Sequence, residues 1–172
     1  MKLTKIVIDC FLLIFLLSCC TFNISGTRLI PEHEGVDPKI VPYVNEYMDL
    51  AKIMGIKFKN KVSIGFKDIN RGVIIGECVY GINFREINID RNYWDHATPI
   101  SKNTLIFHEL AHCYCGRIHD YGLGKEYENE WEGRLEDGCK TSIMSPKILP
   151  DDCMVSHYKY YVVEAFDRCQ PY

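Results

Sequence analysis

The chain has little of what nucleic-acid-binding proteins need. Its 172 residues carry 20 basic and 23 acidic side chains, a formal net charge of −3, and no cluster of Lys and Arg suited to gripping a phosphate backbone. It also has no internal repeat and no low-complexity tract. Hydrophobic residues make up 47% of the chain and aromatic residues 12%, so the chain can bury the core of one globular domain. We therefore expect a single domain and no nucleic-acid partner.

A long apolar run is also missing. The first apolar stretch, Ile6 to Leu17, is interrupted by Asp9 and falls short of the roughly 20 residues that cross a bilayer. Lys2 and Lys5 precede this stretch, an arrangement typical of a secretory signal. The sequence thus predicts an exported protein without a membrane-spanning segment at its start.

The signal region ends in Leu16-Leu17-Ser18-Cys19, which resembles the bacterial lipobox. This resemblance implies that Cys19 receives diacylglycerol and becomes the mature N-terminus, so that a lipid anchors the protein to the membrane of the bacterial cell envelope. We accordingly expect a signal peptide over residues 1–18, a tether over 19–36 and a globular domain over 37–172. The alternative is an ordinary signal peptide cleaved after small residues, although an Ala-x-Ala site is lacking.

The expected domain contains six cysteines. In an exported protein this even number predicts up to three disulfides, with fifteen possible pairings. Cys113 and Cys115 are two residues apart on an expected helix and point to different faces, so each would need a distant partner. The alternative is that the thiols are unpaired and packed as small apolar side chains. The six cysteines are Cys78, Cys113, Cys115, Cys139, Cys153 and Cys169.

The pattern of apolar residues predicts an α+β domain with a small sheet. A first helix is expected to open at Asp37 and Pro38 and to end at Gly55. A second is expected to begin near Ser101 or Asn103 and to end before Gly116 in a left-handed turn. The remaining expected elements are strands over 61–67, 73–80 (with residues 73–75 buried) and 86–90, a loop over 94–99, a solvated acidic segment over 120–138, a turn over 142–150 and a closing helix over 155–169.

Residues 108–112 form a His-Glu-x-x-His pattern. Positions i and i+4 of a helix share one face, so His108 and His112 can direct two imidazoles at one metal ion. Glu109 would then lie beside the metal. A carboxylate there can take a proton from a zinc-bound water, whose pKa the metal lowers from about 15.7 towards about 7. The pattern therefore predicts a Zn²⁺ site with Glu109 as general base.

The same stretch resembles the metzincin motif His-Glu-x-x-His-x-x-Gly-x-x-His. Gly116 and His119 match its last two positions, but each lies one residue further from His112 than in the family. One more residue of helix before the turn would absorb this insertion. Downstream, Met144 in Ser-Ile-Met-Ser-Pro is similar to the Met-turn, whose methionine forms an apolar floor beneath the metal's histidines. The resemblance implies a minimal zincin architecture, with a small mixed sheet packed on the zinc helix and a C-terminal helix.

The identity of the third ligand is open at this point. His119 is the first choice, because the resemblance places it there. Cys115, Asp120 and Glu130 are alternatives, whereas His33, His96 and His157 are expected to be ordinary surface or packed residues.

A zinc metallopeptidase is the expected function. The resemblance also implies that the strand at 86–90 lies at a sheet edge and pairs with extended substrate. We expect a monomeric endopeptidase whose partners are a peptide or protein substrate and, through the lipid, a membrane. The alternative is a lipid-anchored binding module with a structural or vestigial zinc site. Glu109 favours catalysis, because a structural site does not need a general base.

Overall fold

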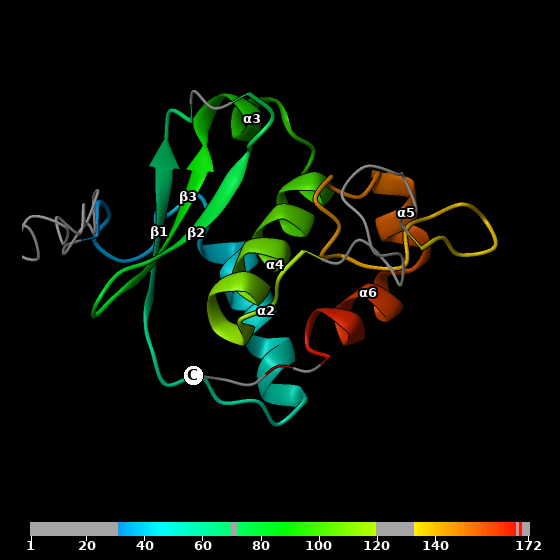
Figure 1. Cartoon of the computed structure of the whole chain (residues 1–172), viewed down its shortest axis with the longest axis horizontal. Helices are drawn as coiled ribbons and strands as arrows, with labels where there is room; N and C mark the ends of the chain where they lie inside the picture. The colour runs from blue at the N-terminus through cyan, green and yellow to red at the C-terminus, as the bar shows by residue number, and fades with distance from the viewer. Residues whose placement is uncertain (1–30, 70–71, 120–132, 168, 170–172) are drawn as a thin grey trace, which may run out of the picture.

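The computed structural model describes residues 31–69, 72–119, 133–167 and 169 (Figure 1). The expected signal peptide, the lipidation candidate Cys19 and most of the expected tether lie outside the described residues. So do two of the alternative zinc ligands, Asp120 and Glu130, and most of the expected acidic segment.

The described part of the chain has the expected mixed α+β composition. Its three strands form one sheet in the order β1-β3-β2, with β1 parallel and β2 antiparallel to β3. In chain order the elements are α2 (Val41–Ile53), β1 (Val62–Lys67), β2 (Gly76–Tyr80), β3 (Arg85–Asp90), α3 (Arg91–His96), α4 (Pro99–Cys115), α5 (Asp151–Ser156) and α6 (Tyr158–Ala165).

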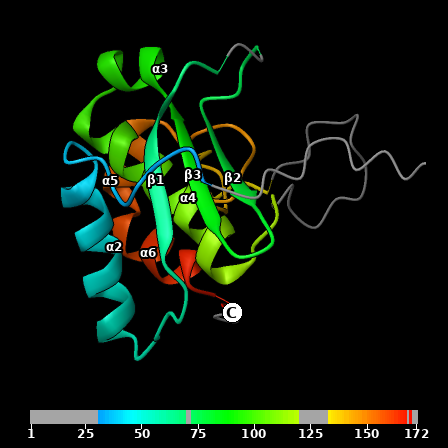
Figure 2. The ribbon, with the colours of Figure 1, turned by 90° about the vertical axis from the view of Figure 1, so that its left-hand side faces the viewer.

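Helix α4 is the centre of the molecule. It packs against one face of the sheet with α2 beside it, and α5 and α6 lie on the side of α4 away from the strands (Figures 1 and 2). Apolar side chains of α4 and the sheet meet in a core from which water is excluded, the main stabilising contribution in a domain of this size. Fully buried members of this core include Ile64, Ile87, Ile89, Leu105, Phe107 and Leu110.

Helix α4 begins earlier than the sequence predicts. Thr98 caps it by accepting the N–H of Ser101 onto its hydroxyl at 3.0 Å, and Pro99 occupies the first turn. Both features are typical of helix starts, because the cap satisfies an N–H that has no partner inside the helix and proline lacks the N–H altogether. The expected start near Ser101 or Asn103 is therefore wrong by two to four residues.

Several other boundaries also differ from expectation. The segment expected to be a loop contains Trp94, which lies in the short helix α3, because Asp90 caps that helix by accepting the N–H of Tyr93 at 2.8 Å. Val73 and Ile74 are exposed rather than buried, and β2 starts only at Gly76. The closing helix is two helices, broken at His157, whose ring bonds to Asp137. The first helix starts at Val41, after a turn over 38–40.

The strand expected to receive substrate is not at an edge. Residues 85–90 form β3, which is hydrogen-bonded to β1 on one side and to β2 on the other. Alternation of polar and apolar residues identifies a strand but does not report how many neighbours it has. In this three-stranded sheet β2 is the edge strand that faces α4. Tyr80 at the end of β2 donates its hydroxyl hydrogen to the carbonyl of His112 in α4 at 2.5 Å.

Three disulfides cross-link the domain, the number that the cysteine count predicts. They join Cys78 to Cys113, Cys115 to Cys169 and Cys139 to Cys153. Cys113 and Cys115 each have a distant partner, as their different helix faces require. Disulfides persist in oxidising surroundings, so they indicate an extracellular or otherwise oxidising environment. Among the helices of the described residues, none has the length and apolar character to cross a membrane.

Candidate metal centre

The end of α4 turns the chain back under the helix. Gly116 has φ 65° and ψ 22°, a left-handed conformation that glycine adopts without steric cost. Its N–H bonds to the carbonyl of His112 at 3.1 Å, and the N–H of Arg117 bonds to that of Ala111 at 3.2 Å. These bonds satisfy carbonyls that the helix end leaves open. The helix runs to Cys115, and three residues after Gly116 the chain brings His119 beneath α4.

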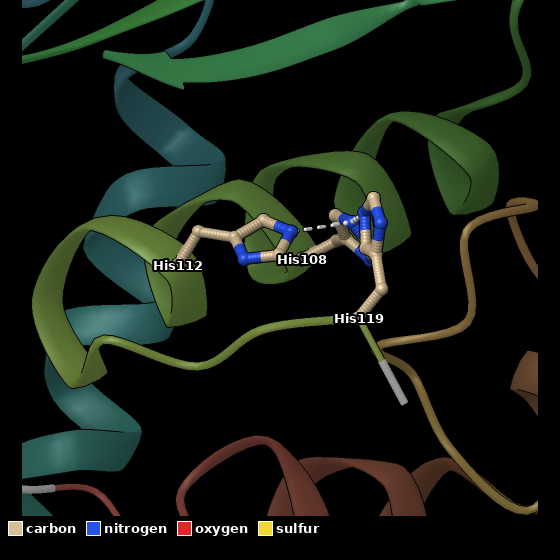
Figure 3. A group of neighbouring side chains, drawn as sticks. All are labelled: His108, His112 and His119. Carbon is tan, nitrogen blue, oxygen red and sulfur yellow. Dashed lines mark hydrogen bonds between the residues drawn. The ribbon is translucent and has the colours of Figure 1, made fainter. Parts of the chain in front are cut away.

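Three imidazole rings converge at this point. His108 and His112 project from α4, and His119 reaches them from the chain that follows the helix (Figure 3). The Nε2 atom of His108 lies 3.0 Å from Nε2 of His112 and 3.2 Å from Nε2 of His119. One nitrogen from each residue is available to a single ion, since the three lie within 4.8 Å of one another.

The outer nitrogens of two rings are held by backbone carbonyls. Nδ1 of His108 lies 2.8 Å from the carbonyl oxygen of Ile143, and Nδ1 of His112 lies 2.5 Å from that of Arg117. A carbonyl oxygen only accepts hydrogen bonds, so each Nδ1 must carry a hydrogen. In a neutral ring Nε2 is then unprotonated, with its lone pair directed at the centre of the cluster.

The surroundings keep these rings neutral. Burial, together with the charge of His112, lowers the pKa of His108 to about 3. Burial also lowers the pKa of His112 and of His119. Lone pairs that face each other at 3.0 Å repel unless a cation lies between them. The donor set therefore fits a metal ion rather than three packed histidines.

The spacing of the nitrogens also fits a small divalent ion. Zn²⁺ binds imidazole nitrogen at about 2.0–2.1 Å in tetrahedral geometry, which puts two such nitrogens about 3.3 Å apart. The observed separations of 3.0 Å and 3.2 Å are close to that value. Three protein nitrogens around one ion would leave one tetrahedral position for a further ligand.

Glu109 is a buried acidic residue of α4 that follows His108 in the chain. The residue is 4% exposed, and its Oε2 atom has no hydrogen-bond partner among the described residues. Burial, together with the charge of Glu77, raises the pKa of the Glu109 carboxyl to about 8. A buried acceptor without a donor is costly and therefore rare in folded proteins. A water or other ligand bound near this oxygen would supply the missing donor.

The edge strand leaves room for this carboxylate. Gly76, the first residue of β2, faces Glu109, and a Cβ at this position would lie 2.7 Å from its Oε1 atom. The disulfide between Cys78 and Cys113 joins the same strand to α4. The absence of a side chain at Gly76 thus allows β2 to lie close to the carboxylate.

Met144, the candidate for the Met-turn, is completely buried. Its N–H bonds to the hydroxyl of Ser142 at 3.0 Å, which closes a tight turn. The residue before it, Ile143, supplies the carbonyl that bonds to His108. The turn is therefore directly attached to the histidine cluster.

Of the other histidine and cysteine candidates, those that the structure describes do not join this cluster. Cys115 is disulfide-bonded to Cys169, so it has no thiolate to offer. His96 bonds to the carbonyl of Asn92 at 2.7 Å, and His33 bonds to the side chain of Asn88 at 2.9 Å. Among the described residues there are two further groups of ligand-type side chains. One is formed by Glu32, His33 and Glu86. The other is formed by Asp137, Cys139 and His157, and its sulfur is already disulfide-bonded.

Sequence reasoning did not identify four residues around the site. Gly76 borders the carboxylate, and the carbonyls of Ile143 and Arg117 hold the rings. Glu164 of α6 bonds to both carbonyl-bearing segments. None carries a local sequence signal, because each acts through a backbone atom, a missing side chain or a partner at least 21 residues away.

Comparisons of the chain with protein-family models, with curated proteins and with solved structures yield no match. The interpretation of the site therefore rests on its own geometry and chemistry.

Proposed function

We propose that this protein is a zinc-dependent endopeptidase of metzincin type. The observation that carries the proposal is the buried Glu109 carboxylate, with one oxygen that no described residue hydrogen-bonds, one residue after the first of three converging histidines. In this proposal His108, His112 and His119 hold Zn²⁺, and Met144 lies beneath their rings. A bound zinc ion would polarise a peptide carbonyl and lower the pKa of a coordinated water.

Glu109 is the proton carrier in this proposal. Its carboxylate accepts a proton from the attacking water and delivers it to the amine that leaves, so that the protonation state of the residue is restored after each turnover. The raised pKa of its carboxyl in the metal-free protein means that the site holds a proton readily near neutral pH. A bound divalent cation would bring this pKa down again, because an opposite charge favours the carboxylate.

The substrate is proposed to lie along β2. This strand is at one edge of the sheet, next to α4. An edge strand offers backbone groups to an extended peptide, which can pair with it in the manner of an added strand. The scissile bond would then pass close to Gly76, the residue that borders the Glu109 carboxylate. This assignment replaces the expectation that residues 86–90 bind the substrate.

The test compares wild type with Glu109→Gln. We expect wild type to cleave a generic peptide library, to lose this activity with a chelator and to recover it with Zn²⁺. Glu109→Gln should bind about one zinc but cleave about 10²–10⁴ times more slowly, the usual cost of removing a general base. Wild-type cleavage by Glu109→Gln would refute the catalytic role. Zinc binding without any cleavage by wild type would favour the alternative of a binding module with a structural site.

We further propose that the protein is exported and held on the bacterial cell envelope by acyl chains on Cys19. The three disulfides support export, because such cross-links form outside the reducing cytosol. Intact-mass analysis of the membrane fraction should give a chain that starts at Cys19 with added acyl mass. Cys19→Ala should lose the acyl mass and leave the membrane fraction, since the acyl chains are the proposed anchor. An unmodified N-terminus would refute the anchor.

A further inference from the structure

One carboxylate gathers the two backbone segments that hold the metal-facing histidines. Oε1 of Glu164 accepts hydrogen bonds from Nη2 of Arg117 at 2.5 Å and from the hydroxyl of Ser142 at 2.9 Å. Oε2 of Glu164 accepts the backbone N–H of Ile143 at 2.9 Å. Arg117 also donates from Nη1 to the backbone carbonyl of Glu164. The side chains of Arg117 and Glu164 are only 12% and 14% exposed.

The residues bonded to Glu164 are the same residues that orient the rings. Ile143 gives its N–H to Glu164 and its carbonyl oxygen to Nδ1 of His108. Arg117 gives its guanidinium to Glu164 and its carbonyl oxygen to Nδ1 of His112. Each of the two rings is thus connected to one α6 carboxylate through a single intervening residue.

The segment of Arg117 also carries the third histidine. His119 is two residues further along the chain and reaches the cluster from this segment, outside any helix (Figure 3). The residues from Gly116 to His119 keep the Gly-x-x-His spacing of the metzincin motif, because the extra residue lies before Gly116. The contact of Arg117 with α6 fixes this segment near its start.

The network has a plain physical purpose. The segments around Arg117 and Ile143 lie far apart in the chain and leave the regular elements, so nothing in α4 alone sets their relative position. A metal ion binds tightly only if its ligands are already oriented, because orienting them on binding costs conformational freedom. Glu164 bonds to both segments, and its charged partner Arg117 strengthens these bonds in surroundings of reduced water access.

We propose that Glu164 and Arg117 are positioning residues that set the histidine cluster for metal binding without contacting the metal. This proposal rests on the proposed metal site. It makes the metal affinity, and not only the fold, depend on a carboxylate of α6. The carboxylate of Glu164 cannot be replaced by an amide. In Glu164→Gln one side-chain oxygen becomes an NH₂ donor, so at least one of the three donors that now meet Glu164 faces a donor instead.

The experiment measures the Zn²⁺ affinity of the purified full-length chain by competition with a chromophoric chelator. Co²⁺ absorption reports ligand geometry in the same variants. Outer-shell partners of metal-binding histidines typically contribute about 10–100-fold in affinity. We expect Zn²⁺ dissociation constants about 10–100-fold higher in Glu164→Gln, with an altered Co²⁺ spectrum. Arg117→Lys keeps the charge but not the paired contacts, so a smaller loss of about tenfold is expected.

Glu46→Gln is the matched control. The Glu46 carboxylate also joins separate elements, since it accepts bonds from Asn103 of α4 at 2.6 Å and from Tyr158 of α6 at 2.5 Å. Its partners contact neither Ile143 nor Arg117 in the hydrogen bonds of the described residues. We expect this variant to lose some stability but to keep the Zn²⁺ affinity and the Co²⁺ spectrum of wild type. A purely structural role of Glu164 would give the same pattern in Glu164→Gln.

Each outcome decides the proposal. Affinities of Glu164→Gln and Arg117→Lys within about threefold of wild type would overturn it, whereas the proposed metal site would stand. A tenfold or larger loss in Glu46→Gln would also overturn it, because the effect would then be a general consequence of weakened packing. If Glu164→Gln does not fold, Arg117→Lys against Glu46→Gln decides alone. A wild-type chain that binds neither Zn²⁺ nor Co²⁺ would refute the proposed function and this proposal together.

Discussion

Replacing Gly76 with alanine tests whether the edge strand sets the position of the Glu109 carboxylate. The added Cβ would lie 2.7 Å from Oε1 and 3.1 Å from Cδ of Glu109, and 3.0 Å from Cδ1 of Leu105. Nonbonded heavy atoms prefer separations near 3.5–4.0 Å, so something must move. The carboxylate is the group that moves most easily, because its Oε2 atom has no hydrogen bond from the described residues to hold it.

The expected effects on stability and on rate are very different in size. Adding a methyl to a packed region costs about 1–3 kcal/mol, whereas alanine in place of glycine at a compatible position stabilises by about 0.4–1 kcal/mol. The net loss of unfolding free energy should therefore be about 1 kcal/mol. A displaced general base, in contrast, lowers the rate of peptide hydrolysis by about 10²–10⁴-fold. Zinc affinity should stay at the wild-type value, since the atoms nearest to an added Cβ belong to Glu109 and Leu105 and not to a histidine.

Gly65→Ala is the matched control. This residue of β1 is also a glycine of the same sheet, and a Cβ there would lie 2.3 Å from Nδ1 of His33 instead. We expect a similar loss of stability in urea unfolding and no loss of hydrolysis rate. If Gly76→Ala hydrolyses peptides as fast as wild type, the carboxylate does not need the space that β2 leaves. If zinc affinity and rate fall together, the strand supports the whole site rather than Glu109.

Three further predictions concern the ligands and the cross-links. His119→Ala should lower zinc affinity by more than the roughly 100-fold expected for an outer partner, as measured by chelator competition, while His157→Ala should not change it. In metal-free protein, His108 is buried as a neutral ring, and its pKa falls from about 6.5 in the unfolded state to about 3 in the folded state. Between these two pH values the unfolded chain binds a proton that the folded protein does not, so the fold loses stability as the pH falls. The unfolding free energy of wild type should thus fall about 1.4 kcal/mol per pH unit more steeply in this range than that of His108→Gln, and equal slopes would contradict the buried neutral ring. Replacing Cys115 and Cys169 with alanine should cost about 4 kcal/mol in urea unfolding, from chain entropy over their separation of 54 residues, and a cost below about 1 kcal/mol would refute this estimate.

The sequence predicted the local parts of the site better than its surroundings. The i, i+4 pair on α4 and the left-handed turn at Gly116 follow from helix geometry and from glycine's freedom, so both were predictable. The convergence of His119 with the other two rings agrees with the family resemblance despite the longer spacing. The extra residue lengthens α4 to Cys115, whose side chain is held by the disulfide to Cys169. The role of His119 as a zinc ligand remains a prediction.

Features that depend on tertiary pairing were not predictable in the same way. The strand at residues 85–90 has an alternating pattern that fits an edge strand and a central strand equally well. Only the strand pairing in the structure gives its central place in the sheet. Helix α3 has six residues, too few to give a periodic signal, and depends on the cap by Asp90. Val73 and Ile74 show the reverse case: β-branched residues at the start of an expected strand are exposed, because the sheet begins later.

The disulfides join the same segments that form the candidate site. The bond from Cys78 to Cys113 ties β2, which borders the Glu109 carboxylate, to the residue that follows His112. The bond from Cys139 to Cys153 anchors the chain just before the Met144 turn to α5. A site assembled from one helix and two irregular segments has no continuous secondary structure to hold it, so its precision must come from cross-links and buried polar contacts. If the cross-links serve this purpose, reducing them should weaken zinc binding before it unfolds the domain, whereas simultaneous loss of zinc and fold would mean that they serve stability alone.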